Sequence, residues 1–311
     1  MLLRGTRYAI TCPGQGLVQP GLLRPFVRYN IDRHLDAIDA AVGFNLSRHM
    51  LDANDSAYLL DTANAQPAIV AATWVTAQVL EQHHGPVVGG ASYLCGHSLG
   101  EYLAMLLSGV VSLETALRTV RLRGELMATL AGFGWGMKAL LFKPAHFDGV
   151  VAECERLRCL ANVNLASQVV ILGRLPYLDH CIGELNRDGR RILKVVDLPV
   201  LVPFHNDILE PLLEQIESFL VGSAIQEQHV PVISNVNAEV LADAATTVRN
   251  AIRGTSRPVR WTDTLATLEA RGVDTVLNLG PGTVLQGLGA KRRFRQVALD
   301  TPESFAQLEQ L

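Results

Sequence analysis

Gly96-His97-Ser98-Leu99-Gly100 fits the G-x-S-x-G pattern of a nucleophile elbow, which links a strand of a sheet to the helix after it. An apolar run, Ala91 to Cys95, leads into it and predicts a strand, and Glu101 to Ser108 follows with a helical pattern. The flanking glycines allow a sharp turn that β-carbons would block. Strand, turn and helix would expose the Ser98 hydroxyl at the top of a sheet. The pattern also arises by chance in glycine-rich chains, but this placement favours the elbow. Ser98 is therefore the candidate nucleophile of an acyl-transfer enzyme.

A serine hydroxyl is a weak nucleophile at neutral pH and needs a base within hydrogen-bond reach. His205 stands in Pro203-Phe204-His205, just before a helix that is expected to begin near Asn206. A histidine at such a junction is well placed to face a cleft between two domains. Most of the other eight histidines are expected at the surface, and His97 should point away from the serine. With Ser98, His205 would form the pair of nucleophile and base, but the residues alone do not single it out among the nine histidines.

The composition is that of an ordinary globular protein. The chain has 311 residues, of which 49% are hydrophobic and 18% charged, which suits one large domain with a smaller one. A net charge of -3 without a basic block argues against nucleic acid as a partner. The most continuous apolar stretch, Pro67 to Leu80, is too short and too polar for the roughly 20 residues of a membrane span.

The five cysteines include no C-x-x-C pair, and the N-terminal residues contain no secretory apolar region. This cysteine usage indicates reduced thiols in a cytosolic or matrix-like compartment. We expect a cytoplasmic protein, or a mitochondrial matrix protein if the source is eukaryotic.

Strand and helix signals alternate along most of the chain, which predicts an α/β fold. The clearest strands are Tyr8–Cys12, Leu94–Gly96 and Thr275–Leu279, and the clearest helices are Pro67–Gln82 and Leu113–Ala131, the second with Ser112 as its N-cap.

Residues 132–196 follow a rhythm of their own. The signals are strand, helix, two strands, helix and strand, at Met137–Phe142, Ala145–Arg158, Leu160–Leu165, Gln168–Leu172, Pro176–Asp188 and Arg191–Val196. That βαββαβ order is typical of a ferredoxin-like domain. We therefore expect a small domain, residues 132–197, inserted into a large domain formed by residues 1–131 and 198–311.

Two further features fit a site for acyl transfer. Arg123 precedes Gly124 inside a helix, where glycine costs about 1 kcal/mol relative to alanine and often marks the close approach of another element. A guanidinium there could hold a carboxylate through two parallel hydrogen bonds, although a solvated helix face would explain it too. Gln15 lies in the turn after the first strand, so its N–H and that of Leu99 could form an oxyanion hole. An ordinary strand-to-helix turn is the alternative for Gln15.

In this order, the motifs resemble those of the malonyl-CoA:acyl-carrier-protein transacylases over essentially the whole chain. The marks of the resemblance are Pro13-Gly14-Gln15-Gly16, Ala65-Gln66-Pro67-Ala68, Gly96-His97-Ser98-Leu99-Gly100-Glu101-Tyr102, Arg123-Gly124-Glu125-Leu126-Met127, Asn162-Val163-Asn164 with Gln168-Val169-Val170, Pro203-Phe204-His205, Ser234-Asn235-Val236-Asn237, Pro258-Val259-Arg260-Trp261 and Gly280-Pro281-Gly282. The resemblance implies an α/β-hydrolase-like large domain with a ferredoxin-like small domain, which agrees with the pattern of elements.

The resemblance also implies roles for individual residues. Ser98 would carry the acyl group, with His205 as its base. The backbone N–H groups of Gln15 and Leu99 would hold the oxyanion.

For the substrate, the resemblance implies that Arg123 pairs with the free carboxylate of malonyl. Phe204 resembles the choice of malonyl-selective members, because a bulky ring there would crowd a 2-methyl branch. Gln66 and Asn164 would complete the substrate pocket.

One position departs from the family pattern. Gly254 stands where many members have a glutamine that helps to orient the catalytic histidine. The Gly254 carbonyl can still fix the imidazole tautomer. No acidic third member of a triad is evident, so a Ser-His dyad is expected.

The expected reaction moves malonyl from malonyl-CoA to the phosphopantetheine thiol of acyl carrier protein, through a malonyl-serine intermediate, for fatty-acid synthesis. No metal or other cofactor is implied, and a monomer is expected. A modest basic patch would receive the carrier. Its candidates, each of which ordinary solvated surface would explain as well or better, are Lys138, Arg190, Arg191, Lys194, Lys291, Arg292 and Arg293. The alternatives are malonyl loading for a malonate decarboxylase or a polyketide synthase, a serine thioesterase or esterase, and a scaffold without activity.

Overall fold

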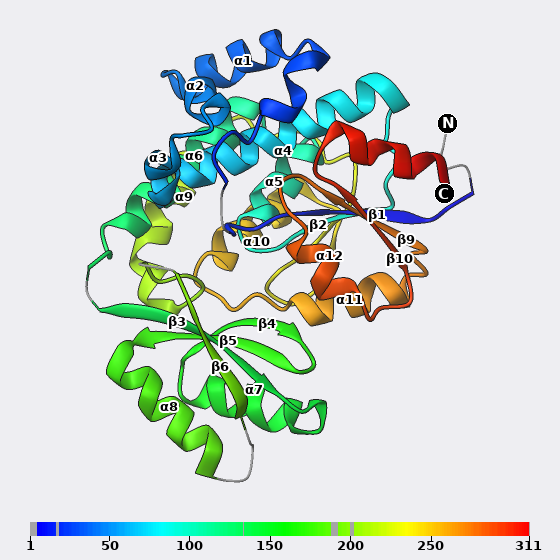
Figure 1. The fold of residues 1–311 in the computed structure, drawn as a ribbon. Helices are drawn as coiled ribbons and strands as arrows, with labels where there is room; N and C mark the ends of the chain where they lie inside the picture. Colours follow the sequence, from blue (N-terminus) through cyan, green and yellow to red (C-terminus); the bar gives the residue numbers. More distant parts are fainter. Residues whose placement is uncertain (1–4, 17–18, 133, 188–191, 200–201, 311) are drawn as a thin grey trace.

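Two β-sheets form the framework of an α/β structure (Figure 1). The computed structural model describes residues 5–16, 19–132, 134–187, 192–199 and 202–310. Within these residues one sheet has six strands in the order β10-β9-β1-β2-β7-β8, and the other has four in the order β4-β5-β3-β6.

The large sheet places the ends of several strands side by side. Its strands are β1 (Tyr8–Cys12), β2 (Tyr93–Gly96), β7 (Val232–Ile233), β8 (Val240–Leu241), β9 (Thr275–Leu279) and β10 (Arg295–Leu299). All neighbours in it pair in parallel except β7 with β8. The carboxyl ends of the parallel strands therefore meet at one edge, which is where open α/β sheets bind ligands.

Both faces of the large sheet are covered by helices, as a parallel sheet requires. Alternation along β1 sends Ile10 and Cys12 into the main core and Ala9 into a second core on the other face. The main core is built with α1 (Asp32–Val42), α2 (Leu46–Leu51), α3 (Ser56–Leu60), α4 (Thr62–His84), α5 (Gly100–Leu107), α6 (Leu113–Ala128), α9 (Glu210–Val221) and α10 (Ala244–Gly254). The second core is built with α11 (Trp261–Ala270) and α12 (Val284–Gly289).

Short 3-10 segments complete the described helices: η1 (Arg24–Tyr29), η2 (Pro144–His146), η3 (Asp207–Leu209) and η4 (Pro302–Gln310). No helix within the described ranges is both long and apolar enough to cross a membrane.

The small sheet is formed by residues between α6 and η3. Its elements follow one another as β3 (Trp135–Phe142), α7 (Phe147–Arg156), β4 (Leu160–Leu165), β5 (Gln168–Arg174), α8 (Leu175–Arg187) and β6 (Ile192–Leu198), and every strand pair in it is antiparallel. Side chains of α7 and α8 pack on one face. The other face meets Met127, Val202 and Phe204.

The two sheets are joined by hydrogen bonds as well as by packing. The N–H of Val163 in β4 donates to the Val259 carbonyl at 2.8 Å, and the Val259 N–H donates to the Ala161 carbonyl at 2.9 Å. This contact fixes the small sheet beside the carboxyl ends of the large sheet, in the lower half of Figure 1.

Some element bounds differ from those that the sequence predicts. The helix expected from Pro67 begins at Thr62, because Asp61 caps it by accepting from the Ala63 N–H at 2.9 Å. The predicted cap of α6 is confirmed, since Ser112 Oγ accepts from the Thr115 N–H at 3.1 Å. His34 is buried, an exception among the histidines, most of which are expected at the surface.

Candidate active site

The G-x-S-x-G stretch forms a strained turn between β2 and α5. Ser98 has a φ of 57°, in the left-handed region that non-glycine residues seldom adopt. A β-carbon at Gly96 would overlap the Gly100 carbonyl, and one at Gly100 would overlap the Cys12 carbonyl of β1. Only glycine therefore fits on either side of the serine, and strain of this kind concentrates at functional sites.

His205 lies against the serine, 107 residues further along the chain. Its Nε2 is 2.5 Å from Ser98 Oγ. Its Nδ1 is 2.8 Å from the Gly254 carbonyl and 3.1 Å from the Arg257 carbonyl. Carbonyls only accept hydrogen bonds, so Nδ1 carries the proton and Nε2 is free to accept from the serine hydroxyl.

The surroundings of His205 favour the neutral imidazole. Burial, with a smaller contribution from the positive charge of Arg123, lowers the pKa of His205 to about 3. The imidazole is therefore neutral at pH 7, which is the form that can take a proton. Like Ser98, His205 has a positive φ, of 56°.

Arg123 is buried beside the pair, at 1% exposure. The neighbouring Gly124 packs so tightly on the start of α4 that a β-carbon would lie 2.6 Å from the Ala63 Cα. The sequence-based prediction of a close approach at Gly124 is thus confirmed. Arg123 Nη1 donates to Gln66 Oε1 at 2.6 Å, and Nε donates to Thr255 Oγ1 at 3.2 Å.

These hydrogen-bond partners of Arg123 are uncharged. Its guanidinium also lies over the Tyr102 ring, 5.6 Å from the ring centre. Burial lowers the pKa of Arg123, but a guanidinium stays protonated in proteins. The site therefore contains a buried cation whose hydrogen-bond partners are the uncharged side chains of Gln66, Thr255 and Tyr102.

A chain of polar groups leads from Arg123 to the turn after β1. Gln66 Nε2 donates to Thr62 Oγ1 at 2.9 Å, and that hydroxyl donates to Gln15 Oε1 at 2.9 Å. The turn lies against the elbow, because a β-carbon at Gly14 would be 2.7 Å from the His97 carbonyl. The structure thus brings Gln15 and Gln66 together with the elbow and Arg123.

Asn164 reaches the site from the small sheet. His97 Nε2 donates to Asn164 Oδ1 at 2.9 Å, so His97 points toward the small sheet, and Asn164 Nδ2 donates to Gln168 at 3.2 Å. A hollow of about 300 Å³ opens here, lined by His97 and Asn164 together with Gln15, Pro281, Leu285 and others. Phe204 is buried on the face of the small sheet that packs against Met127 of α6 and Leu209 of η3.

Asn235 and Glu101 are two site residues that the sequence reasoning did not single out. Asn235 Oδ1 accepts from the Ser98 N–H at 2.8 Å, and Glu101 Oε1 accepts from the Asn235 N–H at 3.2 Å. The signal was present in Ser234-Asn235-Val236-Asn237, where two asparagines and a serine directly follow a buried strand next to β2.

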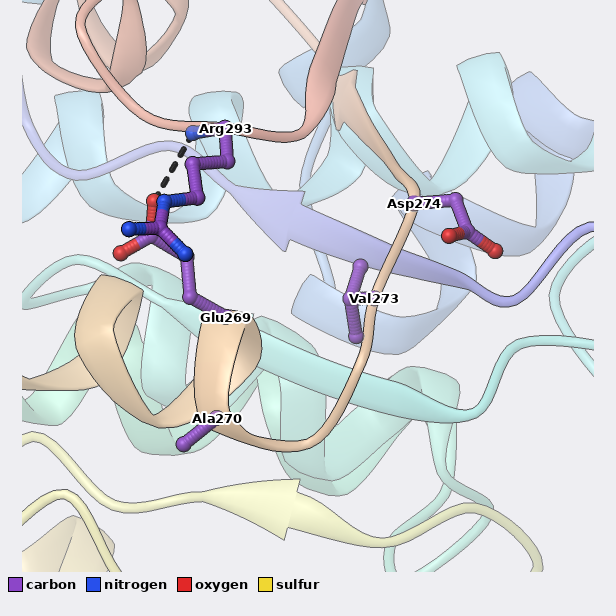
Figure 2. A pocket seen from close by; sticks show the side chains of 5 residues that line it. All are labelled: Glu269, Ala270, Val273, Asp274 and Arg293. Carbon is purple, nitrogen blue, oxygen red and sulfur yellow. Dashed lines mark hydrogen bonds between the residues drawn. The ribbon is translucent and has the colours of Figure 1, made fainter.

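Another hollow, of about 430 Å³, lies at the opposite edge of the large sheet (Figure 2). Its lining includes Asp274, which directly precedes β9, and Arg293, which precedes β10. It therefore opens at the amino ends of the strands, away from the elbow. Neither hollow contains a metal cluster, since no group of three or more His, Cys, Asp or Glu within the described ranges could hold an ion.

Comparison with known proteins decides the family. The model of the acyl transferase domain matches residues 21–302. The chain belongs to the acyl transferase domain family. It is 32% identical over 308 residues to the malonyl CoA-acyl carrier protein transacylase of Bacillus subtilis (strain 168), covering 96% of this chain and 95% of that protein. The resemblance predicted from the motifs is confirmed.

Solved structures of this family have the same fold. FabD from Acinetobacter baumannii superposes with a TM-score of 0.87 at 28% identity, covering 98% of each chain. A malonyl-transacylase in complex with its type II PKS acyl-carrier protein gives a TM-score of 0.87 at 25% identity, covering 98% of this chain and 99% of that one.

The basic residues suggested for carrier docking have different surroundings. Lys138 donates to Asp197 at 2.6 Å, and Arg292 pairs with Glu269 at 3.1 Å. The side chains of Lys194, Lys291 and Arg293 are exposed. The two other candidates, Arg190 and Arg191, lie outside the described residues.

Proposed function

We propose that this acyltransferase moves malonyl from malonyl-CoA to the phosphopantetheine thiol of an acyl carrier protein, by a ping-pong reaction through malonyl-Ser98. The observation that carries the proposal is the Ser98–His205 contact of 2.5 Å next to the buried Arg123. Family membership and the names of the similar proteins support the same reaction.

In the first half-reaction, Ser98 Oγ attacks the thioester carbonyl while His205 Nε2 takes the hydroxyl proton. A C–O bond forms, and the carbonyl oxygen becomes an oxyanion that the N–H groups of Gln15 and Leu99 hold. The N–H of Ser98 is engaged by Asn235, which leaves that of Leu99 at the start of α5 for this task. The C–S bond then breaks, and His205 gives its proton to the departing CoA thiolate.

In the second half-reaction the carrier thiol attacks malonyl-Ser98, and the proton steps run in reverse. His205 takes the thiol proton and returns it to Ser98 Oγ as the C–O bond breaks. Each step uses only this chain and its two substrates, so the mechanism calls for no cofactor.

Arg123 selects the acyl group. A malonyl carboxylate would give this buried cation the anionic partner that Gln66 and Thr255 do not provide. An acetyl group would leave it without one, and a buried unpaired charge costs several kcal/mol. Phe204 would crowd a 2-methyl branch, and Gln66 and Asn164 would line the acyl and thioester parts of the pocket.

We also propose the finer description of the fold. The parallel sheet with its elbow corresponds to an α/β-hydrolase-like domain, residues 1–131 and 198–311. The order β3-α7-β4-β5-α8-β6 and the antiparallel sheet β4-β5-β3-β6 support a ferredoxin-like domain over residues 132–197. The monomeric state and the compartment, cytoplasm or mitochondrial matrix, stay predictions.

Intact-protein mass spectrometry tests the function. The protein is exposed briefly to malonyl-CoA, acetyl-CoA or methylmalonyl-CoA, with Ser98→Ala as control. We expect a malonyl adduct with malonyl-CoA only, absent from the variant and discharged by a holo acyl carrier protein.

Other outcomes of this experiment would support the alternatives. Steady CoA release from several thioesters without an adduct would indicate a hydrolase, and neither adduct nor release would indicate a scaffold. Discharge by fatty-acid, polyketide and malonate-decarboxylase carriers, compared side by side, identifies the pathway, for which we expect the fatty-acid carrier.

A further inference from the structure

The side chain of Asn235 continues the ladder between β7 and β2 beyond the last strand pair. Pairing of the two strands stops at Cys95 opposite Ile233. Two residues further on, Asn235 Oδ1 accepts from the Ser98 N–H at 2.8 Å and Nδ2 donates to the Gly96 carbonyl. One amide therefore satisfies a donor and an acceptor on either side of His97, as a neighbouring strand would.

Asn235 is itself held on its main-chain groups. Glu101 Oε1 accepts from its N–H at 3.2 Å, and the Arg260 N–H donates to its carbonyl at 2.8 Å. Asn235 is 1% exposed and Glu101 2%. A buried network in which every member has partners fixes a unique geometry.

This network acts on the turn that carries the nucleophile. The left-handed conformation of Ser98 costs on the order of 1–3 kcal/mol and persists only where surrounding contacts enforce it. The two bonds of Asn235 are such contacts, because they fix the peptide groups on both sides of His97. Burial raises the pKa of Glu101 to about 8, so at pH 7 it accepts from Asn235 without a charge that would compete for Arg123.

We propose that Asn235 and Glu101 are positioning residues that hold the Ser98 elbow in the conformation from which Oγ attacks the thioester. Asn235 and Glu101 act through the backbone of the elbow and contact neither the thioester nor His205 Nε2. The proposal rests on the proposed function, since it concerns the rate at which Ser98 is acylated.

Single-turnover acylation by malonyl-CoA tests the proposal in the full-length protein. Asn235→Ala is compared with Asn237→Ala, the same substitution at an exposed asparagine two residues away. A misplaced nucleophile costs about 10²-fold in rate, so we expect that loss in the acylation rate of Asn235→Ala, with an unchanged KM. Asn237→Ala should match the wild type. Equal rates for the two variants would overturn the proposal.

A second pair of variants keeps the test decisive if Asn235→Ala does not fold. Glu101→Gln preserves a neutral acceptor for the Asn235 N–H, whereas Glu101→Ala removes it. We expect Glu101→Gln to be acylated at the wild-type rate. The acylation rate of Glu101→Ala should fall about tenfold, because one hydrogen bond to Asn235 is lost. Equal losses in both variants would overturn the role of Glu101. A wild-type protein that forms no adduct would instead refute the proposed function.

Discussion

The two ends of the large sheet each hold a glutamate and an arginine, but the pKa of the glutamate is lowered at one end and raised at the other. At the amino ends, Glu269 accepts from the Arg293 N–H at 2.8 Å and pairs with Arg292 at 3.1 Å (Figure 2 shows the first contact). Burial alone would raise the pKa of Glu269, but the bonds from Arg293 and Arg292 outweigh it and lower the pKa. This end is charged, paired and partly open to solvent.

At the carboxyl ends, burial dominates. The pKa of Glu101 is raised to about 8, and the hydrogen-bond partners of Arg123 are uncharged side chains. A hollow lined by charged residues is therefore not by itself a catalytic site. Catalysis is expected at the carboxyl ends, where the buried Arg123 can bind an anionic substrate group and the neutral imidazole of His205 contacts the Ser98 hydroxyl.

The largest effect on the acylation rate is expected from substitution of His205. The matched control is His229, an exposed histidine that precedes β7 at the amino ends of the strands. His205→Ala removes the base, and general-base catalysis contributes about 10²–10⁴-fold. We expect a loss of that size in the acylation rate, measured by quenched mass spectrometry. His229→Ala should leave the rate unchanged, and a comparable loss in that variant would remove the distinction between the two ends.

Glycines at the two ends should differ in their effect on stability. A β-carbon at Gly100 overlaps the Cys12 carbonyl, so Gly100→Ala should lower the free energy of unfolding by about 3 kcal/mol or more. Gly272, between α11 and β9, has open space and a φ of 70°, so Gly272→Ala should cost about 1 kcal/mol. Urea titrations of both variants measure the difference. Equal costs would contradict the close packing of the elbow.

The pH dependence of stability should have opposite signs for the two glutamates. The folded protein keeps the Glu101 proton up to about pH 8, while the unfolded chain releases it near 4.5. Wild-type stability therefore falls as pH rises through this window, and Glu101→Gln should gain stability relative to wild type. Because the pKa of Glu269 is lowered in the folded protein, its ionised carboxylate stabilises the fold above about pH 4.5. Glu269→Gln should therefore be less stable than wild type at pH 7, and the difference in stability should shrink as the pH falls.

Urea titrations between pH 4 and 8 measure both trends. Parallel curves for the two variants would show that the carboxyl-end glutamate is ionised like its counterpart.

The sequence predicts the fold well where local signals are strong. The bounds of β1, β4 and β9 match the predicted ones, because each is a short stretch rich in apolar residues between turn residues. Gly124 indicated the packing of α6 on α4. A glycine inside a helix lowers the stability of that helix, so its presence there often marks the close approach of another element. The start of α4 was missed because the cap at Asp61 stands outside the apolar stretch.

The site was predictable only in part. Ser98 could be recognised from the residues around it, whereas His205 was chosen as the base among the nine histidines because of the family resemblance. Asn235 lies 137 residues from Ser98, and its contact depends on the pairing of β7 with β2. No local periodicity reports such a contact. The charge state of Glu101 likewise depends on burial by α10 and on groups brought together only in the folded chain.

In the proposed mechanism, the buried Arg123 selects malonyl by binding its carboxylate. The measurement that tests it most directly is kcat/KM for malonyl-CoA and acetyl-CoA in the wild type, in Arg123→Ala and in Arg292→Ala, the paired arginine of the other end. A buried ion pair broken on one side costs about 3–5 kcal/mol, which is on the order of 10² to 5 × 10³-fold. We predict that Arg123→Ala loses this factor for malonyl-CoA and none for acetyl-CoA, while Arg292→Ala keeps the wild-type ratio. An unchanged malonyl-to-acetyl ratio in Arg123→Ala would show that Arg123 does not select the acyl group.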